Sequence, residues 1–169
     1  RFERSPEAVA ALRMNPSRNV RRLPIVFLFA FGMAITIDLI SLAVTGNFWP
    51  VPELLGFFLV GSEGNLISVN PGLFEWAIAL IFLLIMQPIA EEAVFRGALF
   101  PSLRAELGPI AGLLMVSVFH AAFHLVAYSP QGGDFTLLWY ALFVPFIDSL
   151  VITAVRADTG STRAAIVAH

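Results

Sequence analysis

The sequence contains no cysteine, and all ten of its basic residues are arginine. The lack of cysteine excludes disulfides, cysteine-ligated zinc sites and a thiol nucleophile. Only 13% of the 169 residues are charged, the net charge is −2 and no basic stripe is present, so nucleic acid is not an expected partner. Apolar residues make up 58% of the chain, and 16 residues are phenylalanine. Soluble domains contain fewer apolar and more charged residues, so this composition predicts an integral membrane protein.

Long apolar runs predict an all-α polytopic membrane helix bundle of about five spanning helices. The predicted spans are Pro24–Thr45, Leu73–Ala90, Ile110–Tyr128, Phe135–Val155 and a fifth helix that starts at Ser161 and is expected to continue beyond His169. The short apolar stretch Val51–Val60 is expected to be interfacial or re-entrant. The stretch Ala98–Gly108 is expected to be a connector, closed by Gly108-Pro109.

The distribution of arginine predicts the orientation of these helices. If the basic segment 1–22 is cytoplasmic, the inner segments are 1–22, 96–109 and 156–163, and they contain every arginine in the sequence. The outer loops carry only the acids Glu53, Glu63 and Asp134. We therefore expect a cytoplasmic segment 1–22 followed by a membrane domain over 23–169, in a bacterial inner membrane. The glutamate motif described next is expected at the cytoplasmic end of its helix.

The stretch Gln87–Leu99 places two adjacent glutamates and an arginine at the end of an apolar run. Carboxylates are costly next to hydrocarbon and often mark a functional site. On a helix, Glu92 and Arg96 are i,i+4 neighbours and are expected to pair. Glu91 points about 100° away and lacks that partner. Glu91 is therefore the expected general base.

Two histidines, His120 and His124, share one face of the third predicted span, and His169 ends the sequence. In one mechanism Glu91 and His124 hold and deprotonate a water, and His169 donates to the developing oxyanion. No metal or other cofactor is expected in this mechanism.

In an alternative mechanism His120, His124 and a glutamate ligate zinc. The histidine spacing matches that of H-E-x-x-H metalloproteases. Ala121 follows the first histidine, however, so Glu91 would have to supply the general base from another helix.

These motifs resemble the CPBP family, which comprises type II CAAX prenyl proteases and bacteriocin-processing membrane proteins and is also called Abi. The family's E-E-x-x-x-R motif is present from Glu91 to Arg96. Its F-x-x-x-H motif ends at His124, with His120 in the phenylalanine position. A third motif, histidine followed four residues later by Asn or Asp, begins at His169. The resemblance extends over Leu73–His169.

The resemblance implies an intramembrane glutamic endopeptidase in which Glu91, His124 and His169 are catalytic. Glu92 and Arg96 would be the supporting pair, and His120 would either assist catalysis or replace an aromatic ring. The expected partners are the lipid bilayer and a peptide or lipidated-protein substrate. Two other functions are compatible with the sequence: a non-catalytic membrane scaffold, and a small transporter that uses Glu91 and the histidines as a proton relay.

Overall fold

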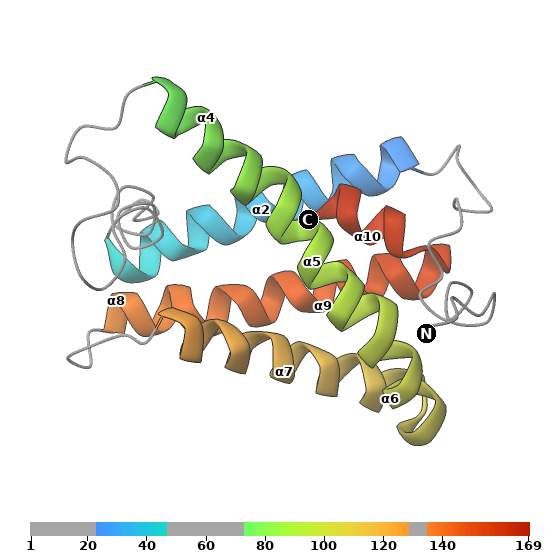
Figure 1. Ribbon diagram of the computed structural model, residues 1–169. Helices are drawn as coiled ribbons and strands as arrows, with labels where there is room; N and C mark the ends of the chain where they lie inside the picture. The colour runs from blue at the N-terminus through green and yellow to red at the C-terminus, as the bar shows by residue number, and fades with distance from the viewer. Residues whose placement is uncertain (1–22, 47–72, 129–134) are drawn as a thin grey trace.

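The computed structural model describes residues 23–46, 73–128 and 135–169, and the regular elements in these ranges are all helical (Figure 1). The α-helices are α2 (Leu23–Thr45), α4 (Leu73–Ile81), α5 (Gln87–Glu92), α6 (Phe100–Leu107), α7 (Pro109–Tyr128), α8 (Phe135–Leu138), α9 (Val144–Thr159) and α10 (Thr162–Ala168). The π-helical segments are η2 (Phe82–Met86), η3 (Ala93–Leu99) and η4 (Trp139–Phe143). The expected all-α bundle is confirmed.

Four helical runs within the described residues are long and apolar enough to cross a membrane. They are Pro24–Thr45, Trp76–Leu107, Pro109–Ala127 and Trp139–Thr159. Large apolar side chains on these helices point outward, whereas many buried side chains are polar. This distribution suits a lipid environment, because hydrocarbon solvates the outer face and polar groups must find partners inside.

The fifth helix, α10, begins where the sequence predicts. The Ser161 hydroxyl accepts a hydrogen bond from the Ala164 amide at 3.4 Å, and Gly160 turns the chain with a φ of 67°. Serine is a favoured N-cap residue, and glycine tolerates this positive φ. The helix has seven residues. Its start lies close to the end of α9, and α10 packs against α9, α2 and α5.

Each π-helical segment is followed closely by a proline in the first turn of the next α-helix. Pro88 follows η2, Pro101 follows η3 and Pro145 follows η4. Proline cannot donate the usual backbone hydrogen bond, and such positions are where helices adjust their winding. The helical run 73–107 continues through Pro88 and Pro101, and the run 135–159 continues through Pro145.

The expected connector at Ala98–Gly108 is wrong. Residues Leu73–Leu107 form one helical run, in which α4, η2, α5, η3 and α6 follow one another directly, and the chain turns only at Gly108, with a φ of 85°. A Cβ atom at Gly112 would lie 2.8 Å from the Arg104 backbone, so α6 and α7 pack closely after this turn. Glycine at 112 permits the close approach.

The glutamate motif consequently lies near the middle of the run Trp76–Leu107, which has 32 residues, and not at the end of its helix. Figure 1 shows this run crossing the bundle diagonally, with α5 at its centre. Arg96 is fully buried and Arg156 is 2% exposed, so neither is a loop arginine. The other arginines still fall in the segments predicted to be inner, and the orientation stays a prediction. The predicted basic segment 1–22 and the short apolar stretch Val51–Val60 lie outside the described residues.

Candidate active site

The two adjacent glutamates are both buried but point to different partners. Glu91 is 7% exposed and Glu92 is fully buried. Arg96 Nη1 donates to Glu92 Oε1 at 2.8 Å, as their spacing predicts. Glu91 makes its contacts with α7 and with its own helix. The two carboxylates therefore have different partners, as the helical angle between them predicts.

Arg96 also links the helical run 73–107 to α9 through hydrogen bonds. Its Nε donates to the Thr153 hydroxyl at 3.1 Å, and its Nη2 donates to the Ser149 hydroxyl at 2.8 Å and the Ser149 carbonyl at 3.2 Å. The guanidinium presents donors in a rigid planar fork, which suits several oxygens at fixed positions. This network fixes the position of Glu92 relative to α9.

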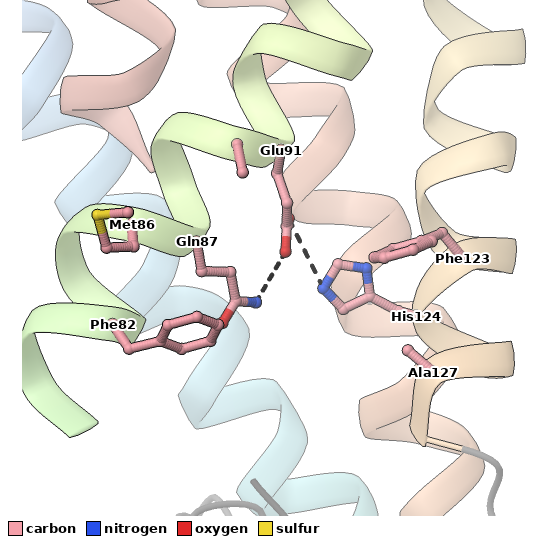
Figure 2. A pocket seen from close by; sticks show the side chains of 8 residues that line it. Phe82, Met86, Gln87, Glu91, Phe123, His124 and Ala127 are labelled. Atoms are coloured by element: carbon pink, nitrogen blue, oxygen red, sulfur yellow. Dashed lines mark hydrogen bonds and ion pairs between the residues drawn. The ribbon is translucent and has the colours of Figure 1, made fainter. Parts of the chain in front are cut away.

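Glu91 is held on both carboxylate oxygens. Oε1 accepts a hydrogen bond from Gln87 Nε2 at 2.7 Å, and Oε2 lies 2.8 Å from His120 Nε2. His124 Nε2 lies 3.9 Å from the same Oε2 (Figure 2). His120 is therefore the nearer of the two histidines to Glu91, and the role of His124 in holding a water stays a prediction. One helical turn separates the two histidines, and the tilt of the long helix across α7 brings the first of them against the carboxylate.

The backbone orients both imidazole rings. His124 Nδ1 lies 3.1 Å from the His120 carbonyl, so Nδ1 carries a hydrogen and Nε2 is directed toward Glu91. His120 Nδ1 lies 3.4 Å from the Pro145 carbonyl, and its Nε2 faces the carboxylate. The His120 ring also packs edge-on against Phe95, with centroids 4.8 Å apart. The position of each ring is therefore set by contacts on two sides.

His169 reaches the same region but contacts the other glutamate. Its Nδ1 lies 2.8 Å from Glu92 Oε1, and its side chain is 21% exposed. Its ring centroid lies 6.4 Å from that of His120. Glu92 Oε1 thus binds both Arg96 and His169, while Oε2 is buried without a hydrogen-bond partner among the described residues.

A pocket of about 320 Å³ opens beside Glu91 (Figure 2). Its polar lining consists of Glu91, Gln87 and His124. Its remaining lining is apolar and consists of Phe82, Met86, Ala90, Phe123 and Ala127. The pocket therefore combines a hydrogen-bonded carboxylate with a surface suited to hydrocarbon.

The residues Glu91, His120 and His124 also have the composition of a metal site. One donor atom from each lies within 4.8 Å of the others, and all three residues are buried. Two histidines and a carboxylate with an open fourth position are a known zinc arrangement. The donor set therefore fits zinc as well as an activated water.

Sequence reasoning missed three residues of this region. Gln87 is bonded to Glu91, and Ser149 and Thr153 are bonded to Arg96. Gln87 stands four residues before Glu91, and Ser149 and Thr153 are four apart in an apolar helix, so their spacing was a usable signal. Nothing in the sequence indicated that Ser149 and Thr153 contact Arg96 on another helix.

A family model, described as type II CAAX prenyl endopeptidase Rce1-like, matches residues 73–169. No curated protein and no solved structure matches the chain. The matched residues include both glutamates, the three histidines and the pocket beside Glu91. They also cover more than half of the sequence. The chain belongs to the Rce1-like family of type II CAAX prenyl endopeptidases.

Proposed function

We propose that the protein is a glutamic intramembrane endopeptidase, in which Glu91 activates a water that attacks a peptide bond of a lipid-modified substrate. The observation that supports this most directly is the pair of acceptors formed by Glu91 Oε2 and His124 Nε2, which are 3.9 Å apart. A water within hydrogen-bonding distance of both atoms can donate one hydrogen to each. The lone pairs of that water are then left to attack a carbonyl carbon.

Glu91 takes the proton as the water oxygen forms its bond to the carbonyl carbon. The carbonyl oxygen becomes an oxyanion in the resulting tetrahedral intermediate. When the carbon–nitrogen bond breaks, protonated Glu91 returns its proton to the departing nitrogen. The products are a carboxylic acid and an amine, and Glu91 is restored to its ionised form.

His169 is the proposed oxyanion donor. Its Nδ1 is tethered to Glu92, which keeps the ring in one orientation and leaves Nε2 as the atom that would contact the substrate. With Nδ1 donating to Glu92, donation from Nε2 requires a hydrogen on both ring nitrogens. Glu92 and Arg96 would act by positioning His169, and they would not contact the reacting atoms.

The pocket supports a substrate that carries a hydrocarbon group near the scissile bond. Its apolar wall is continuous with the carboxylate, so a lipid chain lying along Phe82, Met86 and Ala127 would bring neighbouring peptide bonds to Glu91. A peptide bond inside a regular helix has its carbonyl already hydrogen-bonded, so a short flexible lipidated end is the better substrate.

The proposal is tested with purified protein in liposomes and two synthetic peptides of one sequence, one farnesylated and one not. Wild-type protein is expected to cleave the farnesylated peptide faster. Glu91→Gln should abolish cleavage while leaving the fold intact, whereas the control Glu106→Gln, at an exposed acid of α6, should cleave normally. Retained cleavage by Glu91→Gln would refute the glutamate mechanism. Absence of cleavage in all variants would favour the scaffold or transporter hypotheses.

Zinc is a second candidate, because three ligand atoms already lie within 4.8 Å of one another. Bound zinc would lower the pKa of its water and replace Glu91 as the activating group. Loss of cleavage on treatment with a chelator, recovery on adding zinc, and stoichiometric zinc in the purified protein would support this mechanism. The glutamate mechanism predicts that chelation has no effect.

A further inference from the structure

A second pocket, of about 400 Å³, lies at the end of the bundle where α6 and α9 finish. It is lined by Phe100, Pro101, Arg104, Ala105 and Arg156. Two of these five residues are arginines, and none is acidic. Its lining therefore contains two basic side chains and is chemically unlike the apolar lining of the pocket beside Glu91.

We propose that this pocket binds the phosphate of an anionic membrane phospholipid. Guanidinium groups bind phosphate through paired hydrogen bonds, and basic pockets between membrane helices are recognised sites for anionic headgroups. Phe100 and Pro101 supply apolar contacts for the part of the lipid next to the phosphate.

The two arginines contribute differently. Arg156 is 2% exposed, and its Nε donates to the Arg96 carbonyl and the Thr162 hydroxyl, both at 3.2 Å, so its position is fixed. Arg104 is exposed, and among the described residues its side chain has no ion-pair partner. A buried arginine and an exposed arginine lining one pocket suit a ligand that enters from the bilayer.

The position of the pocket also favours a lipid over the substrate peptide. Arg104 lies thirteen positions after Glu91 on one helical run, which corresponds to roughly 20 Å along the axis. The tripeptide that follows the cleaved bond in a CAAX end spans at most about 11 Å. The tripeptide is therefore shorter than the separation of Glu91 and Arg104 along the helix axis.

The pocket lies near a membrane surface, because α6, the start of α7 and the end of α9 meet at one end of the bundle (Figure 1). Phospholipid phosphates occupy that level on either side of a bilayer, so the proposal does not depend on the predicted orientation. It is also independent of the cleavage mechanism.

The test measures lipid binding by the full chain in detergent, using native mass spectrometry and the thermal unfolding midpoint. Phosphatidylglycerol is expected to be retained and to raise the midpoint more than phosphatidylcholine does. Arg104→Gln should weaken phosphatidylglycerol binding about fivefold, which is the effect of one arginine near an anionic surface. Arg104→Lys should keep most of the binding, because it keeps the charge.

The matched control is Arg163→Gln, which removes an exposed arginine of α10 that does not line the pocket. This variant should bind phosphatidylglycerol as the wild type does. Equal losses in Arg104→Gln and Arg163→Gln, or equal effects of the two lipids on the wild type, would overturn the proposal. An equal stabilisation by inorganic phosphate alone would overturn the lipid assignment and indicate a soluble anion.

Discussion

His120 Nε2 lies 2.8 Å from Glu91 Oε2, in direct hydrogen-bonding contact across two helices. The family pattern has phenylalanine at the position of His120, so this contact is a departure from it. The contact places a second imidazole beside the Glu91 carboxylate. His124 Nε2 is farther from the same oxygen, at 3.9 Å. The site in this chain therefore contains one carboxylate and two histidines. Substitutions at separate residues test what each contributes.

Replacing His120 by phenylalanine tests whether this histidine assists catalysis. The variant restores the aromatic residue of the family pattern and can keep the edge-on contact with Phe95. It removes the hydrogen bond to Glu91, so we expect kcat to fall by about tenfold or more with the fold intact. Cleavage of a farnesylated peptide and circular dichroism measure the two effects. Unchanged kcat would mean that His120 only occupies the place of an aromatic ring.

Arg96→Ala is expected to lower the free energy of unfolding by about 3 to 5 kcal/mol. Arg96 and Glu92 are both fully buried, and the substitution leaves the Glu92 carboxylate with His169 as its only remaining partner among the described residues and removes the hydrogen bonds to α9. Unfolding of the purified protein in mixed micelles measures the change. Arg163→Ala, at an exposed position of α10, serves as the control and should shift stability by no more than about 0.5 kcal/mol. Equal stability of the two variants would mean that the buried pair contributes nothing.

Gln87→Met should lower kcat and leave KM nearly unchanged. Methionine has a similar length and preserves the packing, but it cannot donate to Glu91 Oε1 as Gln87 Nε2 does at 2.7 Å. Because hydrogen bonds to charged groups are among the stronger ones, we expect kcat to fall by roughly tenfold. Met86→Leu, at a neighbouring residue of the same pocket, is the control for packing. A rise in KM alone would assign Gln87 to substrate binding.

Ala127→Phe should raise KM for a farnesylated peptide by roughly tenfold, because the new ring fills part of the apolar pocket. The unmodified peptide should be affected less. Ala122→Phe adds the same ring at an exposed position of α7 that does not line the pocket, and it should behave as the wild type. Equal effects of Ala127→Phe on both peptides would place the lipid chain elsewhere.

The sequence was sufficient for features that depend on neighbours within a few residues. The Glu92–Arg96 pair forms at 2.8 Å because residues four apart share a helix face, and Ser161 caps α10 because its hydroxyl reaches the amide three residues on. The same reasoning failed at Ala98–Gly108. There Arg104, Glu106 and Gly108-Pro109 suggested a connector, whereas the helical run continues to Leu107 and the chain turns only at Gly108.

Composition, span length and local periodicity thus determined by themselves that this is a helical membrane protein with two buried glutamates facing different ways. Only the tertiary structure decided that His120 is the nearer histidine to Glu91, and that His169 contacts Glu92 across 77 positions. The physical reason is that helical geometry fixes the direction of a side chain, whereas the tilt and depth at which helices cross fix which side chains meet. Those crossings depend on the packing of the whole bundle.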